Sequence, residues 1–126
     1  MAVIELTSKT FDSTITGNDI VLLDFWAPWC GPCRQFAPVF ESISEAHPDV
    51  VFAKINTEVE RELAGHFQIR SIPTLMVFRQ QIVVFAQPGA LPPAALASII
   101  EKVKELDMDD VRRQIDEQAV QQGGKA

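Results

Sequence analysis

Residues 20–40 read IVLLDFWAPWCGPCRQFAPVF, and this stretch decides the fold. Its first seven residues are almost continuously apolar, which is typical of a central strand buried on both faces of a parallel sheet. The Ala-Pro-Trp sequence at 27–29 ends that run. From Cys33 onward the apolar residues recur at helical spacing; they are Phe36, Val39, Phe40 and Ile43. This spacing predicts a helix with one buried face, so a strand, a tight loop and a helix follow one another here.

The rest of the chain alternates between strand and helix patterns. Further strands are predicted at residues 3–6, 50–56, 75–78 and 82–85. Further helices are predicted near residues 11–15, at 57–65 and around 96–103. Thr57 and Glu60 have the spacing of a capping box, which places the start of the second of these helices. Strand–helix alternation of this kind predicts an α/β fold with a mixed central sheet.

The composition is that of a globular protein, with 47% apolar and 22% charged residues in a chain of 126. A chain of this length can bury a core without disulfide or metal staples. The net charge is −6 and there is no basic cluster, so nucleic-acid binding is not expected. No apolar run approaches the roughly 20 residues of a membrane span, and residues 1–6 lack the features of a secretory signal. We therefore expect a cytoplasmic protein that binds no membrane.

Cys30 and Cys33 are the only cysteines of the chain, and they lie between the predicted strand and the predicted helix. A C-x-x-C sequence in this setting is typical of redox sites. At a helix N-terminus, free backbone N–H groups and the helix dipole stabilise a thiolate, here that of Cys30. Gly31 permits a tight turn and the close approach of a partner chain, and Pro32 has the fixed φ of a first-turn residue. Cys33, one turn along, is close enough to form a disulfide with Cys30.

Three other interpretations of the two cysteines are weighed against this one. A zinc site needs four ligands, and the remaining candidates, His47 and His66, lack the spacing of a zinc finger. An inert structural disulfide that closes so short a loop would stabilise the fold little. Two buried thiols without a chemical role are disfavoured by the flanking Trp, Gly and Pro residues. We therefore expect a redox site and no metal site.

Asp24 interrupts an otherwise apolar strand. Because burial of an unpaired carboxylate is costly, we expect its pKa to be raised. A carboxyl group of this kind beside a dithiol can transfer protons during disulfide exchange. Lys54 interrupts the next apolar strand and is a candidate partner of Asp24. The alternatives are a solvated carboxylate at a strand end and an ordinary surface lysine.

The segment DFWAPWCGPC at 24–33, Pro38, Lys54, the Ile-Pro-Thr sequence at 72–74 and Gly89 together resemble the thioredoxin family, in its order and spacing. The resemblance covers roughly residues 3–106. It implies a thioredoxin fold, with a mixed five-stranded sheet flanked by four helices. The expected organisation is a thioredoxin domain at 1–106 and a short C-terminal extension at 107–126, weakly helical and then disordered.

The resemblance also implies a role for each site residue. Cys30 is the nucleophile that attacks target disulfides, Cys33 resolves the mixed disulfide, and Asp24, with Lys54 as a possible partner, assists proton transfer. The Ile72–Pro73 bond is expected to be cis beside the dithiol. The residues implied in substrate binding are Trp29, Gly31, Pro32, Ile72, Pro73, Gly89 and Ala90.

The implied activity is that of a protein dithiol–disulfide oxidoreductase that reduces disulfides in cytosolic target proteins. Such a protein is expected to act as a monomer with no bound cofactor. Its expected partners are disulfide-containing targets and thioredoxin reductase, which supplies electrons from NADPH. Two other function classes are kept open: a binding module whose apolar patch holds a client protein, and a chaperone-like holdase.

Overall fold

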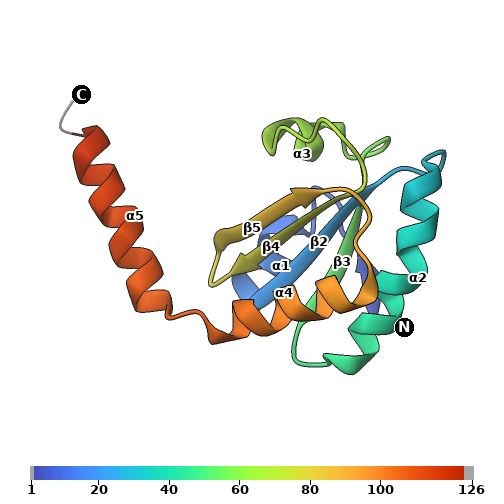
Figure 1. Ribbon diagram of the computed structural model, residues 1–126. Coiled ribbons are helices and arrows are strands. Elements are labelled where there is room, and N and C mark those ends of the chain that lie inside the picture. The colour runs from blue at the N-terminus through green and yellow to red at the C-terminus, as the bar shows by residue number, and fades with distance from the viewer. Residues whose placement is uncertain (1, 124–126) are drawn as a thin grey trace.

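The computed structural model describes residues 2–123, and it shows a five-stranded sheet with helices on both faces (Figure 1). The strands are β1 (Val3–Glu5), β2 (Ile20–Trp26), β3 (Val51–Asn56), β4 (Thr74–Arg79) and β5 (Ile82–Pro88). The helices are α1 (Phe11–Gly17), α2 (Gly31–Ala46), α3 (Arg61–His66), α4 (Pro93–Glu105) and α5 (Met108–Gly123). The strand order is β1-β3-β2-β4-β5, so the predicted α/β fold with a mixed sheet is confirmed.

Strand β2 lies at the centre of the sheet, as its apolar sequence predicts. It pairs in parallel with β3 and antiparallel with β4. The register places Asp24 of β2 opposite Lys54 of β3 on one side and opposite Leu75 of β4 on the other. Because successive side chains of a strand alternate, Asp24 points to the same face of the sheet as Leu22 and Trp26.

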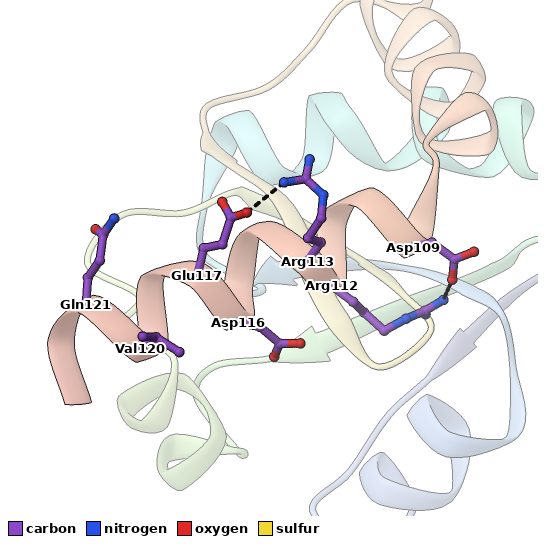
Figure 2. A pocket seen from close by; sticks show the side chains of 7 residues that line it. All are labelled: Asp109, Arg112, Arg113, Asp116, Glu117, Val120 and Gln121. Atoms are coloured by element: carbon purple, nitrogen blue, oxygen red, sulfur yellow. Dashed lines mark hydrogen bonds and ion pairs between the residues drawn. The ribbon is translucent and has the colours of Figure 1, made fainter. Parts of the chain in front are cut away.

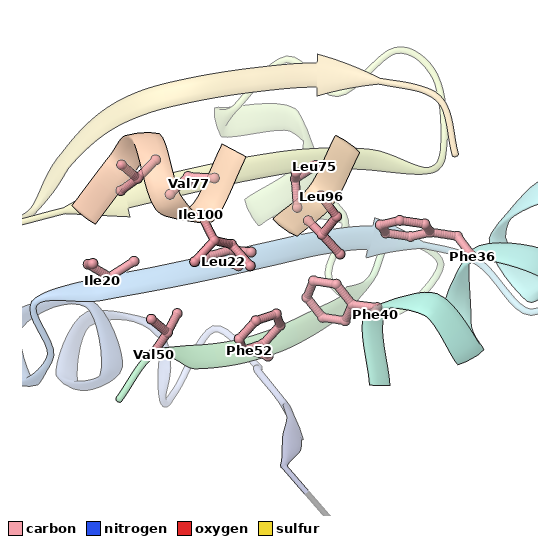
Figure 3. Close-up of a cluster of buried hydrophobic side chains, with 11 residues drawn as sticks. Ile20, Leu22, Phe36, Phe40, Val50, Phe52, Leu75, Val77, Leu96 and Ile100 are labelled. Carbon is pink, nitrogen blue, oxygen red and sulfur yellow. The ribbon is translucent and has the colours of Figure 1, made fainter. Parts of the chain in front are cut away.

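The larger core lies between the sheet and helices α2 and α4 (Figure 3). It is made by buried side chains from three strands, both helices and the residue before β3: Ile20, Leu22, Phe36, Phe40, Val50, Phe52, Leu75, Val77, Leu96, Ile100 and Val103. A second cluster, with Leu23 and Phe25 of β2, lies on the opposite face, where Ile15 of α1 joins it. Each fully buried Leu or Phe contributes about 1.5–3 kcal/mol, so the two layers hold β2 rigidly.

The predicted capping box at Thr57 and Glu60 does not form, and the prediction that a helix begins at Thr57 was wrong. The Thr57 hydroxyl donates instead to the carbonyl of Trp26 at 3.0 Å. The Glu60 carboxylate accepts from the backbone N–H of Ser8 at 2.9 Å. Both side chains are thus used by segments distant in sequence, and α3 begins only at Arg61.

The hairpin between β4 and β5 turns at Gln80 and Gln81, where the sequence lacks the usual Asn-Gly. Both residues have positive φ angles, 51° and 69°. Two successive residues of this kind are the mark of a type I′ turn, whose twist matches that of the flanking strands. The two strands predicted at 75–78 and 82–85 thus form a hairpin, with glutamines in left-handed positions that glycine or asparagine usually occupy.

Helix α5 is much longer than the weak extension that the sequence predicts. Asp107 begins it, because its carboxylate accepts from the backbone N–H groups of Asp109 and Asp110 at 3.1 and 3.2 Å. The helix runs for 16 residues to Gly123, past Gln121, where fraying is expected. The predicted disorder at 124–126 lies outside the described residues. In Figure 1, α5 projects from the end of the sheet opposite to the loop between β2 and α2.

Ion pairs along its own surface stabilise α5. Arg112 pairs with Asp109 at 2.6 Å, and Arg113 pairs with Glu117 at 2.7 Å (Figure 2). The hollow drawn there is lined by α5 alone: Asp109, Arg112, Arg113, Asp116, Glu117, Val120 and Gln121. It is therefore the charged flank of one helix rather than a cleft between elements. Exposed pairs of this spacing each favour helix formation only slightly, because water and salt screen them.

Candidate active site

The two cysteines lie at the N-terminus of α2. Cys30 is the N-cap residue, Pro32 stands in the first turn, and Cys33 follows on the same side of the helix. Cys30 and Cys33 form a disulfide with a Cα–Cα distance of 5.2 Å. The backbone N–H of Cys33 donates to Cys30 Sγ at 3.2 Å. This N–H and the positive end of the α2 dipole both point at Cys30 Sγ, a geometry of the kind that stabilises a thiolate.

Apolar neighbours surround the disulfide. Cys30 is 4% exposed and Cys33 is 2% exposed, and both pack with buried Ala27. The side chains of Trp26 and Ile72 complete this small cluster. Cys30 Sγ lies 3.7 Å from the carbonyl oxygen of Ile72, which places the loop before β4 directly against the dithiol.

Three loops meet around the dithiol: residues 27–30 after β2, residues 67–73 before β4 and residues 89–92 after β5. They carry most of the residues that the family resemblance implies in substrate binding. The Ile72–Pro73 peptide bond is cis, as the family resemblance implies. The backbone N–H of Gly89 donates to the carbonyl of Pro73 at 2.8 Å, which joins the end of β5 to the loop before β4. Gly89 has a φ of 102°, a conformation that favours glycine. Ala90 is exposed, whereas the Pro73 side chain is buried.

Trp29 is the most prominent side chain of this surface, with 65% of its area exposed. Its indole Nε1–H donates to the carboxylate of Glu58, in the loop after β3. Arg61 approaches the other carboxylate oxygen of Glu58 at 3.9 Å. Glu58 is a site residue that no local sequence pattern marks. The available signal was its position two residues after β3, at the same sheet edge as the end of β2.

Arg34 lies in the first turn of α2, one residue after Cys33. Its Nη1 donates to the carbonyl of Pro28 at 2.9 Å. The guanidinium thus closes the loop from Pro28 to Cys33 on itself, and it adds a positive charge next to the dithiol. Gly31 and Pro32, the two residues between the cysteines, lie within this closed loop and are partly or fully exposed.

Asp24 is 1% exposed, in the layer of the sheet that α2 covers. Burial raises its pKa from 3.8 to about 7, and the nearby positive charge of Lys54 partly opposes that rise. Among the described residues, no donor lies within hydrogen-bond distance of Asp24 Oδ1. Asp24 is therefore a carboxyl group that binds and releases protons near neutral pH.

Lys54 is opposite Asp24 in the sheet register, but its ammonium group lies over the ring of Trp26 rather than beside the Asp24 carboxyl. Lys54 Nζ lies 4.4 Å from the ring centroid of Trp26, a cation–π contact. Within residues 2–123 the two charged groups do not approach closely enough to form a salt bridge. Lys54 thus acts on Asp24 through its charge from a position fixed by Trp26.

The two histidines lie away from the cysteines. His47 Nδ1 is 3.1 Å from Lys104 Nζ, and the His66 ring packs edge-on against Phe67. Residues 2–123 contain no group of three or more His, Cys, Asp or Glu side chains placed to hold a metal ion. The same part of the chain has no helix of the length and apolar character that crossing a membrane requires.

Comparison with known proteins identifies the family of this chain. The model of the thioredoxin family matches residues 2–102, which include every site residue described above. The chain belongs to the thioredoxin family. A protein of Streptomyces coelicolor named "Putative thioredoxin 2" is 58% identical over 120 residues, 95% of this chain and 90% of its own length. The thioredoxin of Porphyra purpurea is 42% identical over 104 residues, 81% of this chain and 97% of its own length.

Solved thioredoxin structures confirm the fold. A mutant thioredoxin from Halobacterium salinarum has a TM-score of 0.77 at 35% identity, covering 82% of this chain and 92% of that one. Plasmodium falciparum thioredoxin has a TM-score of 0.73 at 36% identity, covering 79% and 96%. The thioredoxin family model ends at residue 102, before α5, whereas the 120-residue match to the Streptomyces protein takes in most of that helix.

With a thioredoxin fold and a C-x-x-C pair at this position, the chain is a dithiol–disulfide oxidoreductase that acts on disulfide-containing proteins. In such exchange a thiolate attacks one sulfur of a disulfide and displaces the other as a thiolate. A second thiol then attacks the mixed disulfide. One dithiol becomes a disulfide, one target disulfide becomes a dithiol, and two electrons move.

Proposed function

We propose that this chain reduces disulfides of cytosolic target proteins and is itself reduced by thioredoxin reductase with electrons from NADPH. The observation that carries the proposal is the position of Cys30 Sγ at the N-terminus of α2, where the Cys33 N–H donates to it at 3.2 Å. The Gly31-Pro32 pair between the cysteines favours a reductant over an oxidant. A reducing dithiol in turn favours a reducing compartment such as the cytoplasm.

Cys30 is the proposed nucleophile, and Cys33 is the proposed resolving thiol. A helix N-terminus that lowers a thiol pKa from about 8.5 to about 7, the value typical of the thioredoxin family, raises the thiolate fraction at pH 7 about 16-fold. Nucleophilicity falls about fivefold over the same shift, so the net gain is only about threefold. Thiolate population alone therefore does not make an efficient enzyme, and alignment of the target has to supply most of the rate.

The surface that aligns the target, here called the docking surface, is proposed to consist of residues from the three loops and the first turn of α2: Trp29, Gly31, Pro32, Ile72, Pro73, Gly89 and Ala90. The backbone at Ile72 can pair with an extended target segment, in the manner of an added strand. That pairing would bring a target sulfur close to Cys30, because Cys30 Sγ lies 3.7 Å from the Ile72 carbonyl.

Asp24 is proposed to accept the Cys33 proton when Cys33 attacks the mixed disulfide, and Lys54 to modulate its pKa. A group with a pKa of about 7 takes up and releases protons readily at neutral pH. The layer that α2 covers gives Asp24 a position on the Cys33 side of the sheet. Solvent has little access to either group, since both are at most 2% exposed.

Glu58 is proposed to fix the orientation of the Trp29 indole. Glu58→Ala is expected to lower kcat/KM for a protein disulfide about two- to fivefold, the effect of losing about 0.5–1 kcal/mol. Glu58→Gln keeps an acceptor oxygen and is expected to retain most of the rate. Rates with insulin and with a small aromatic disulfide measure the effect, and Glu62→Ala, at an exposed site on α3, is the matched control. Equal losses with both substrates would refute a docking role.

The proposed division of the chain is a domain at 1–106 and an extension at 107–126, with buried Met108 and a hydrogen bond from Arg112 to Gln80 Oε1 as contacts between them. Met108 is buried, and Arg79 Nη1 donates to the carbonyls of Val103 and Leu106 at 2.7 Å. From Arg112 onward, the side chains described for α5 are exposed.

A chain ending at residue 114 keeps both Met108 and Arg112, and it is therefore expected to keep the unfolding free energy and activity of the full chain. A chain ending at residue 106 is expected to lose about 1.5–3 kcal/mol, the contribution of one buried methionine. Denaturant unfolding of both truncations and the full chain measures the difference. Equal stability of all three would show that Met108 does not hold the junction.

Insulin reduction with NADPH and thioredoxin reductase tests the proposed function most directly. Insulin precipitation and NADPH consumption are expected together, and both are expected to stop when Cys30 and Cys33 are replaced by serine. A chain that binds a client equally well with and without the two cysteines, and reduces nothing, would instead be a binding module.

We further propose that the chain acts as a monomer that binds neither nucleic acid nor membranes, in keeping with its net charge of −6. Sedimentation measures the first of these points.

A further inference from the structure

A groove of about 260 Å³ lies beside the docking surface, between residues 67–71 and the end of β5. Its lining includes apolar side chains from both sides: Phe67, Ile69, Met76 and Ala86. Arg70 is the one charged residue of the lining, and Gln68 and Gln87 add polar groups. The groove therefore has an apolar part and a single positive charge.

The groove is continuous with the docking surface along the chain. Ser71 and Pro88 line it, and the residues that follow them are Ile72 and Gly89 of the docking surface. The hydrogen bond from the Gly89 N–H to the Pro73 carbonyl ties these two segments together. Strand β5, which forms one wall, is the last strand of the sheet. A target segment that pairs with the backbone at Ile72 can therefore continue into the groove beyond the dithiol.

Arg70 is free to pair with a carboxylate from outside the chain. Its side chain is exposed, and within residues 2–123 it takes part in no salt bridge. Five other cations are already paired with carboxylates: Arg61, Arg79, Lys104, Arg112 and Arg113. In a chain of net charge −6, an unpaired guanidinium at the rim of an apolar groove is a local site of positive charge.

We propose that this groove is a second subsite for target proteins, which takes an apolar side chain of the target while Arg70 pairs with a neighbouring carboxylate. The proposal rests on the proposed function, and it names the substrate class: disulfides flanked by an apolar residue next to Asp or Glu. The docking surface aligns the sulfur, and the groove selects among the sequences around it.

A set of disulfide peptides tests this selection. Each peptide carries Leu-Glu, Leu-Lys or Gly-Glu at two to five residues from the reacting cysteine, on either side. The unmodified chain is expected to reduce the best Leu-Glu peptide about fivefold faster than its Leu-Lys counterpart, as kcat/KM. Arg70→Glu is expected to reverse that preference. Lys9→Glu makes the same charge change at an exposed site before α1 and is expected to keep the original preference.

A second variant tests the apolar part of the groove. Ala86→Trp, on the exposed end of β5, fills the groove and is expected to reduce the advantage of Leu-Glu over Gly-Glu about fivefold. All rates are divided by the rate of the same variant with a small disulfide.

An unchanged Glu-to-Lys ratio in Arg70→Glu, or an equal change in Lys9→Glu, would overturn the subsite. If the unmodified chain reduces insulin and small disulfides without any peptide preference, the subsite is refuted while the proposed function stands. If it reduces none of these substrates, both fail.

Discussion

Replacement of Cys33 by serine is expected to trap the chain in a covalent complex with its target. Cys30 can still attack, because the hydrogen bond it receives comes from the backbone N–H of residue 33 and survives the substitution. The mixed disulfide then has no second thiol to resolve it. We expect turnover of insulin to fall by more than about 100-fold, to the level at which free thiols in solution release the target. A disulfide-linked adduct on a non-reducing gel, confirmed by mass spectrometry, measures the effect.

Cys30→Ser is the matched control, and it should not form the adduct. Cys30 is the N-cap of α2 and its sulfur accepts from the Cys33 backbone N–H, so the helix N-terminus stabilises a thiolate at Cys30 rather than at the slightly more buried Cys33. Alkylation at pH 7 should show the same asymmetry, with Cys30 of the reduced chain modified much faster than Cys33. Adducts of equal yield in the two variants would contradict the assignment of nucleophile and resolving thiol.

The sequence predicted those parts of the molecule that depend on neighbouring residues. The apolar run of β2, the helical spacing after Cys33 and the C-x-x-C pair each carry their signal within a few residues, and each occurs as predicted. The buried carboxyl of Asp24 is of the same kind, because one polar residue in an apolar strand is visible in the sequence. Local patterns were sufficient to locate the dithiol and the strand beneath it.

The features that the sequence did not predict depend on partners distant in the chain. Glu58 accepts from Trp29, 29 residues away, so its position after β3 gave no direct sign of that contact. Thr57 and Glu60 match a capping box, but their side chains hydrogen-bond instead to the backbone of Trp26 and of Ser8, respectively. The full length of α5 depends on ion pairs whose combined effect a scan for apolar spacing overlooks.

Asp24→Asn is expected to change the unfolding free energy of the oxidised chain more favourably at pH 8 than at pH 4, and the difference between the two pH values is about 4 kcal/mol. The Asp24 carboxyl has a pKa of about 7 in the folded chain, against 3.8 for the free group. Between these two values the unfolded chain has lost the proton while the folded chain still holds it. Stability therefore falls as pH rises from about 4 to about 7, and it changes no further above that. Asparagine does not titrate, so the variant lacks this loss, and denaturant unfolding at pH 4, 6 and 8 measures it.

Asp49→Asn provides a control of opposite sign. A hydrogen bond from Lys104 lowers the pKa of the Asp49 carboxyl, so its removal should destabilise the chain at neutral pH and matter less in acid. Asp24→Asn is also expected to slow insulin reduction, because the variant has no group to accept the Cys33 proton. A variant that is more stable but slower fits a carboxylate retained for catalysis at a cost in stability. If Asp24→Asn were instead less stable at pH 8 than the unmodified chain, the carboxylate would have to be paired in the folded state, and its role in proton transfer would lose its physical basis.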